Sequence, residues 1–359
     1  MVEAYSHGSI TGSVTNGKAW AEWVDVDEDL NFATSSASMS DSFRSRQTCT
    51  GYTGEGEDFP TATLDEQVDR YIHEVVNKTS ATLGYAHIII LGGNDIGHLL
   101  GAYARYIIGQ TLEDSGVLGD DGYDDYVPYE KVFELVDSVP QLTSGPLITD
   151  VVAALTNGVM RLREAGVGGT IFIGNVLSLK WSPGYEEDEQ TNIIESIIIA
   201  VNEGILSVIE SNEQLRLLDL YSFFGSIADD PDAWMEQGFV APEDEESGEL
   251  LPLGTACFEA DFFVDSYAEI MGTQALRAPD CQEECALCAD DTSPCQACYT
   301  GNPSATICDR PDTRIMWDTI HPTTATHRLM GHAIQECVRK EPDFNLPFVE
   351  KLCPCIVEG

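Results

Sequence analysis

An aspartate, a histidine and a proline near the C-terminus have the types and spacing of catalytic groups. In the run Trp317-Asp318-Thr319-Ile320-His321-Pro322, the acid lies three residues before the histidine. Pro322 fixes its own φ and disfavours helical backbone at His321, so one turn can place the carboxylate beside the imidazole. Such a carboxylate holds the ring tautomer, and the free ring nitrogen can take a proton from a serine. Asp318 and His321 are therefore candidates for two members of a hydrolytic triad.

A second candidate group follows an apolar run. Residues 87–91 read His-Ile-Ile-Ile-Leu, which predicts a short strand buried on both faces, and Gly92-Gly93-Asn94-Asp95 comes next. Ligands of open parallel sheets bind beyond the carboxyl ends of the strands. The Asn94 amide could therefore donate a hydrogen bond to a developing oxyanion. The alternative is a turn in which Asn94 or Asp95 caps the next helix.

Helical and strand patterns alternate along the chain and must position these groups. This alternation predicts an α/β fold with a parallel sheet and helices on both faces. The acidic and cysteine-rich residues 241–313 are expected to form an insertion in one domain that covers residues 1–359. Apolar spacing predicts helices at 65–78, 148–162, 192–210 and 324–338, and strands at 87–91, 170–173 and 215–219.

The charge balance narrows the possible partners. The 359 residues include 61 acidic and 18 basic side chains, which give a formal net charge of −43. Such a charge repels phosphate backbones and anionic lipid surfaces, so it argues against binding to nucleic acid or to a membrane surface. No run of about 18 apolar residues occurs, so no transmembrane segment is expected.

Ten of the eleven cysteines lie between Cys257 and Cys355, which suggests a disulfide-braced region and an oxidising compartment. A glycosylation sequon at Asn77 agrees with export, although no signal peptide is visible after Met1. Either the protein is cytosolic and thiol-rich, or residues are missing before Met1. The alternative is a zinc site, because two Cys-x-x-Cys pairs occur between residues 285 and 298. Their short separation and the lack of a nearby histidine favour disulfides.

Several motifs together resemble the GDSL-type esterases and lipases, the SGNH hydrolases. They are Gly-x-Asn-Asp after a strand, Asp-x-x-His-Pro-Thr before a C-terminal helix, and the small-residue loop Asn31 to Ala37. Two further segments look like family segments: Asn16-Gly17-Lys18-Ala19-Trp20 and Asp219-Leu220-Tyr221. As in the family, cysteines precede the Trp317 block, here Cys298 and Cys308. The resemblance covers nearly the whole chain and is closest to the lipase, acetylesterase and haemolysin-like branch.

The resemblance implies a three-layer sandwich with a mostly parallel, flavodoxin-like central sheet. It also implies that the protein hydrolyses carboxylic esters, with an acylated sugar or lipid as substrate and without a cofactor. His321 would be the general base, Asp318 its orienting partner and Asn94 an oxyanion donor. Ser36 stands where the family has a glycine whose backbone N–H completes the oxyanion hole, so its own N–H is expected to donate there.

The family's nucleophile lies in a Gly-Asp-Ser block after an apolar strand, and this sequence contains no such block. Ser9 lacks the aspartate and the strand, and it lies too near Asn16 for the family's arrangement. Losing an interior strand would leave backbone groups unpaired. We therefore expect an N-terminally incomplete esterase whose upstream segment holds the signal peptide and the nucleophile. The alternative is a catalytically inactive, secreted SGNH-fold binding protein. Both interpretations predict an extracellular protein.

Overall fold

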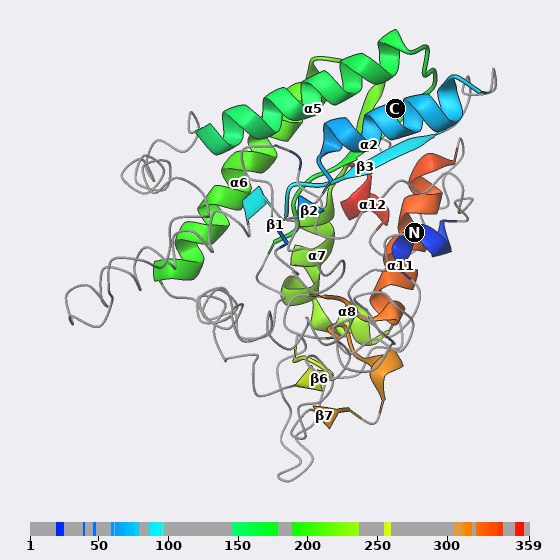
Figure 1. The fold of residues 1–359 in the computed structure, drawn as a ribbon. Coiled ribbons are helices and arrows are strands. Elements are labelled where there is room, and N and C mark those ends of the chain that lie inside the picture. The colour runs from blue at the N-terminus through cyan, green and yellow to red at the C-terminus, as the bar shows by residue number, and fades with distance from the viewer. Residues whose placement is uncertain are drawn as a thin grey trace, which may run out of the picture.

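In a computed structural model, helices flank a small parallel sheet (Figure 1). The structure describes residues 19–24, 39, 46–47, 59–60, 62–78, 86–93, 95–96, 146–178, 189–236, 255–259, 306–308, 310–317, 321–339 and 349–354. The helices are α1 (Trp20–Trp23), α2 (Leu64–Tyr71), α5 (Pro146–Glu164), α6 (Glu189–Glu210), α7 (Leu220–Asp229), α8 (Pro231–Met235), α11 (Thr324–Val338) and α12 (Val349–Leu352), with a π-helical turn η3 (Ile72–Val76) and a 3-10 turn η5 (Pro311–Thr313). The strands are β1 (Arg46–Gln47), β2 (Phe59–Pro60), β3 (His87–Ile90), β4 (Ile171–Gly174), β5 (Leu215–Leu218), β6 (Phe258–Glu259) and β7 (Thr306–Ile307).

Strands β3, β4 and β5 lie side by side in that order and run parallel. His87 pairs with Ile171, and Ile171 pairs with Leu215, so the three strands start together. β4 is buried throughout, whereas Ile89 is the one buried residue of β3. The sequence predicted that residues 87–91 are buried on both faces. They are more exposed because, among the described residues, β3 has one neighbouring strand and β4 has two.

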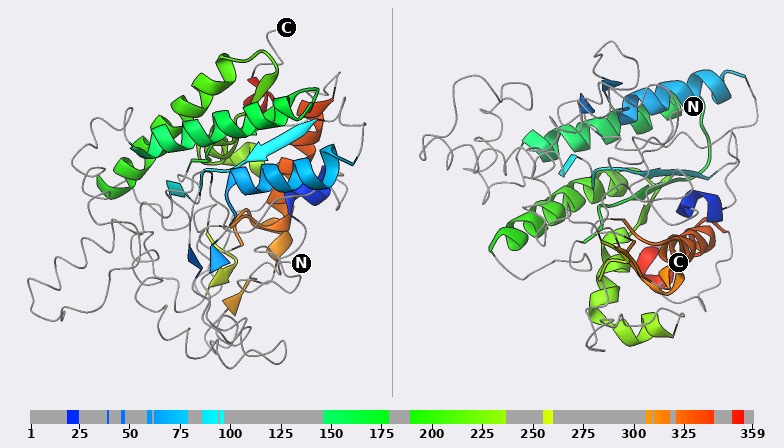
Figure 2. Two further views of the ribbon diagram at one scale, coloured as in Figure 1. Left: turned by 45° about the horizontal axis from the view of Figure 1, so that its top comes forward. Right: turned by 60° about the horizontal axis from the view of Figure 1, so that its bottom comes forward.

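Helices α2, α5 and α6 cover one face of the sheet. Ile171 and Ile173 point to this side, because alternate residues of a strand face opposite sides. They join an apolar cluster with buried side chains of the three helices, among them Val68, Leu155 and Ile205. Figure 2 shows α5 and α6 next to each other on this face.

Helices α7, α11 and α12 cover the other face (Figure 2, right). Phe172 and Leu218 point to this side and share a second apolar cluster with Phe223, Ile334 and Leu352. Each face of the sheet therefore has its own core. The predicted α/β class, with helices on both faces of a parallel sheet, is confirmed.

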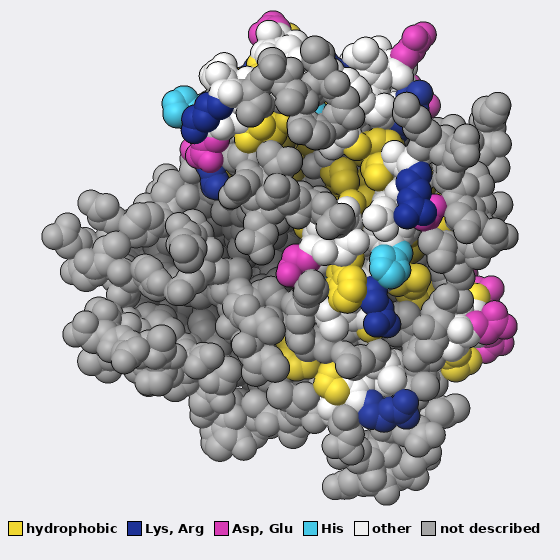
Figure 3. Space-filling model, turned by 90° about the vertical axis from the view of Figure 1, so that its right-hand side faces the viewer, with side chains coloured by type: hydrophobic (Ala, Val, Ile, Leu, Met, Phe, Trp, Pro, Cys, Tyr) yellow, Lys and Arg dark blue, Asp and Glu magenta, His cyan; other side chains and the backbone are white. Residues whose placement is uncertain are grey.

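Helix α1 packs closely against α11 at Gly331. A Cβ at Gly331 would come within 2.5 Å of the Trp23 Cβ and 2.8 Å of the Trp20 carbonyl oxygen, so a glycine is required there. The Trp23 ring also lies 6.0 Å from the Arg328 guanidinium and meets His332 edge-on. The space-filling view of this side shows basic and histidine side chains beside apolar ones (Figure 3).

Two of the predicted helices show how local sequence sets their bounds. The helix predicted at 324–338 is α11, with those same bounds. The helix predicted at 65–78 begins one residue earlier, because Thr63 and Glu66 form a capping box with bonds of 3.4 and 3.0 Å. Its last part, Ile72–Val76, is π-helical.

Parts of the predicted insertion at 241–313 belong to the described residues. β6 and β7 pair antiparallel there, and Cys257 forms a disulfide with Cys308. A second disulfide joins Cys337 of α11 to Cys353. Disulfide bonding is thus confirmed for these two pairs. The remaining cysteines, including those of the zinc alternative, lie outside the described residues.

Among the helices that the structure describes, none combines the length and the apolar character needed to cross a membrane. The two longest of them, α5 with 19 residues and α6 with 22, pack against the sheet and against each other. The organisation of residues 1–359 as one domain stays a prediction.

Candidate functional site

Of the four predicted site residues, the structure describes His321. Asp318, Asn94 and Ser36 lie outside the described residues. Each of these three has described neighbours in the chain, and the contacts of those neighbours show which segments meet. Ser9 also lies outside the described residues.

His321 lies on the second arm of a short antiparallel hairpin that precedes α11. Its carbonyl oxygen accepts the Trp317 N–H at 2.8 Å. Two residues later, the Thr323 N–H donates to the Ile315 carbonyl at 2.9 Å. The first bond holds the backbone of His321, and the second holds the chain two residues later.

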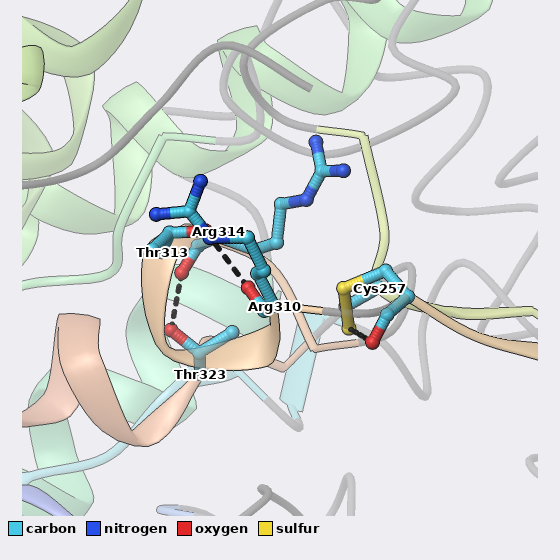
Figure 4. The surroundings of a disulfide bond; sticks show 6 residues. Cys257, Arg310, Thr313, Arg314 and Thr323 are labelled. Carbon is cyan, nitrogen blue, oxygen red and sulfur yellow. Dashed lines mark hydrogen bonds between the residues drawn. A yellow bond between two sulfur atoms is a disulfide. The ribbon is translucent and has the colours of Figure 1, made fainter. Parts of the chain in front are cut away.

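Two buried threonines fasten this hairpin to the start of α11. The Thr323 hydroxyl donates to the Arg314 carbonyl and, as the helix N-cap, accepts the Thr326 N–H at 3.3 Å. The Thr326 hydroxyl donates to the Ile315 carbonyl at 2.8 Å. Figure 4 shows Thr323 below the turn that runs from Arg310 to Arg314, with its hydroxyl facing that turn. The N-cap of α11 thus sets the place of the hairpin arm that carries His321.

His327 lies one turn into α11, close enough to His321 for their charges to interact. The side chain as a whole is partly buried, and its Nδ1 is fully buried with no hydrogen-bond partner in the described part of the chain. Burial, followed by the charge of His321, lowers the pKa of His327 from 6.5 to about 4. His327 is therefore neutral near pH 7 and adds no like charge beside His321.

Acidification should destabilise the wild-type protein more than a His327→Leu variant. An unfolded histidine binds its proton below pH 6.5, whereas the pKa of His327 in the folded protein is about 4. The stability that this difference confers is present above pH 6.5 and is lost as the pH falls toward 4, by about 2 kcal/mol at about pH 5. Leucine has similar bulk and does not titrate. Urea unfolding of both proteins at about pH 7.5 and about pH 5 measures the difference, and equal losses would contradict the burial of His327.

A buried carboxylate links the segments that carry the two predicted oxyanion donors. Asp95 directly follows Asn94 in the chain and is fully buried, and its Oδ2 accepts the Met39 N–H at 2.7 Å. Met39 follows Ser36 by three residues and is buried in the core beneath α2, α5 and α6. Because 56 residues separate Asp95 from Met39, the bond joins two distant parts of the chain.

Gly92 lets the end of β3 approach the loop after β4. Its φ of +109° lies in the region that favours glycine, and a Cβ there would come within 3.0 Å of Val176. The side-chain amide of Asn202, on α6, accepts the Val176 N–H and donates to the Val176 carbonyl, both at 2.8 Å. In the same loop, the Ser178 hydroxyl donates to the buried Glu195 carboxylate at 2.8 Å. The loops at this edge of the sheet are therefore closely packed and anchored to α6.

Two polar residues past the ends of β4 and β5 form a network that sequence reasoning did not select as part of the site. Asn175 donates to the Asp219 carboxylate at 2.8 Å and accepts the Tyr221 N–H at 2.9 Å. Asp219 also caps α7 by accepting the N–H and the hydroxyl of Ser222. Both residues directly follow apolar strand runs, the same signal that selected Asn94. Because its carboxylate accepts several bonds, Asp219 acts here as a structural link between β4 and α7.

Together, these contacts define a mixed α/β protein in which Asp95, Asn175 and Asp219 follow the carboxyl ends of three parallel strands. No group of three or more His, Cys, Asp or Glu side chains in the described part is placed to hold a metal ion. Comparison with known proteins gives no narrower class, since no protein-family model and no curated protein matches the sequence.

Proposed function

We propose that the protein is an ester hydrolase of the SGNH type, with a three-layer sandwich around a flavodoxin-like, mostly parallel sheet. The proposed substrates are carboxylic esters such as acylated sugars or lipids. In this proposal His321 is the general base and Asp318 orients its ring. Asn94 and the backbone N–H of Ser36 stabilise the oxyanion.

The hydrogen bond between Asp95 and Met39 is the observation that carries this proposal. Oxyanion stabilisation requires donors that are held in place before the charge develops. The proposed donors, Asn94 and Ser36, are far apart in the chain, and the 2.7 Å bond between their neighbours supports a meeting of the two segments. A buried carboxylate is costly unless it is hydrogen-bonded, so Asp95 is expected to hold this contact firmly.

The surroundings of His321 also support the proposal. Its backbone is held by the Trp317 N–H, and its side chain is partly exposed. A general base must be held within reach of the proton that it takes, and it must be free to carry a positive charge during the reaction. Because His327 stays neutral near pH 7, it does not oppose that charge.

In the proposed reaction, a serine hydroxyl attacks the ester carbonyl and passes its proton to His321. The oxyanion that forms accepts hydrogen bonds from Asn94 and Ser36. The intermediate then expels the alcohol, which takes the proton from His321 and leaves an acyl-enzyme. Water attacks the acyl group by the same route and releases the acid. The proposed steps use no cofactor.

Hydrolysis of a short-chain aryl ester by the protein, expressed from its complete coding sequence, tests the proposal. A fluorophosphonate probe bonds covalently to activated serines, and mass spectrometry of the labelled peptide locates the nucleophile. We expect one labelled serine and hydrolysis that the probe abolishes. If labelling fails and hydrolysis does not exceed that of heat-denatured protein, the inactive binding protein becomes the better interpretation.

The two disulfides support secretion as part of the proposal. Disulfides form and persist in oxidising compartments and are rare in reducing ones. Cys257 pairs with Cys308, and Cys337 pairs with Cys353. Both disulfides lie in the C-terminal part of the chain, where the clustered cysteines predicted a disulfide-braced region.

A further inference from the structure

We propose that the Cys257–Cys308 disulfide is a positioning element for His321, and that its reduction lowers the rate of ester hydrolysis. This inference rests on the proposed function, which gives His321 its catalytic task. It extends that function, because the position of the general base would depend on the oxidation state of two cysteines outside the triad.

The disulfide is joined to the hairpin by backbone hydrogen bonds. The Cys257 N–H is shared between the carbonyl oxygens of Met316, at 3.1 Å, and Trp317, at 3.0 Å. The Cys308 N–H donates to the Cys257 carbonyl at 2.8 Å, so the two cysteines are linked by a hydrogen bond as well as by the disulfide. Figure 4 shows Cys257 beside the turn that holds Thr323.

The hairpin in turn fixes the position of the His321 backbone. The Trp317 N–H donates to the His321 carbonyl at 2.8 Å, and Met316 forms a bridge with Pro322. Met316 and Trp317 therefore have Cys257 on one side and the arm that carries His321 on the other. If Cys257 moves away, the carbonyl groups of the buried residues Met316 and Trp317 lose a hydrogen-bond donor. This arm of the hairpin can then shift.

The strands around this disulfide are short. β6 and β7 have two residues each, and 51 residues of chain separate Cys257 from Cys308. Strands of this length make few hydrogen bonds, and a covalent link across a long loop greatly restricts the chain that it closes. Among the described residues, the disulfide is thus the main restraint that keeps Cys257 next to Trp317.

The two disulfides differ in their accessibility to a reductant. Cys308 is partly exposed, whereas Cys257, Cys337 and Cys353 are buried. A thiolate can therefore attack the Cys308 Sγ and release the Cys257 Sγ as a thiolate. With a dithiol reductant, the second thiol then displaces Cys308. The protein gains two electrons and two protons as two thiols, and the dithiol becomes a cyclic disulfide.

Paired serine substitutions test the inference. Cys257→Ser with Cys308→Ser should lower kcat by about 10- to 100-fold with little change in KM, because the base is displaced while substrate contacts remain. The Trp317 amide proton should exchange with solvent at least about tenfold faster. Cys337→Ser with Cys353→Ser is the matched control, since it removes the disulfide at the other end of α11. It should keep kcat within about twofold.

Mild reduction of the wild-type protein provides a second measurement in case the first double variant fails to fold. Activity should fall as the Cys257–Cys308 bond is reduced, as followed by alkylation and mass spectrometry, and should return on reoxidation. Unchanged kcat and unchanged Trp317 exchange after complete reduction of this bond would overturn the inference. If the protein lacks esterase activity, the proposed function fails, and faster Trp317 exchange on reduction still supports the positioning role by itself.

Discussion

Replacing His321 with alanine should lower kcat/KM for aryl ester hydrolysis by about 10²- to 10⁴-fold. The imidazole is the proposed proton acceptor, and alanine cannot take its place. The fold should survive, because the hairpin is held by the His321 carbonyl, which accepts the Trp317 N–H at 2.8 Å and is retained in alanine. Initial rates with a short-chain aryl ester, together with circular dichroism of the purified variant, measure both expectations.

His332→Ala is the matched control for this variant. His332 is exposed on α11, and its ring meets Trp23 edge-on at the α1 contact. Its loss should leave the hydrolysis rate within about twofold of the wild-type rate. Equal rates for the wild type and His321→Ala would remove His321 from the proposed triad. A loss of the same size in both variants would point to a structural effect on α11 instead.

Asp95→Ala should lower the free energy of unfolding by about 3 kcal/mol and should also reduce kcat. The substitution leaves the buried Met39 N–H without the acceptor that now lies 2.7 Å away. A hydrogen bond to a charged group is among the stronger ones, and an unpaired buried donor adds a further penalty. The rate should fall because the segments of Asn94 and Ser36 lose their link. Urea unfolding and initial-rate measurements follow the two effects separately.

Asp65→Ala tests whether the effect of Asp95→Ala comes from burial. Asp65 is about half exposed and forms a 3.0 Å ion pair with Arg161, so its removal should cost about 0.5 kcal/mol. Similar losses of unfolding free energy in the two variants would argue against a strong buried hydrogen bond at Asp95. A destabilised Asp95→Ala protein with unchanged kcat would show that the bond between Asp95 and Met39 stabilises the fold without supporting the proposed oxyanion hole.

Periodic apolar residues made the main elements predictable. Helix α11 begins and ends where the pattern at 324–338 indicated, because a helix must bury the same stripe at every turn. The strand predicted at 215–219 is β5, which ends one residue earlier because Asp219 caps α7. Local signals of this kind depend on neighbours in the chain, so they can be identified without a structure.

Contacts between distant segments could not be predicted in the same way. The sequence indicated Asn94 or Asp95 as a possible helix cap, and nothing local indicated that the Asp95 carboxylate would accept the Met39 N–H, 56 residues earlier. The pairing of Cys257 with Cys308 is one of many that eleven cysteines allow. Asn175 was missed because a polar residue after a strand is also common in ordinary loops.

The packing of α1 against Gly331 constrains the order in which the chain can fold during synthesis. Roughly 300 residues separate the two helices, so the surface of α11 that contacts α1 is made long after α1 itself. Until then Trp20 and Trp23 remain without their partner on α11. The contact between α1 and α11 is therefore expected to form late in folding, after both helices have been made.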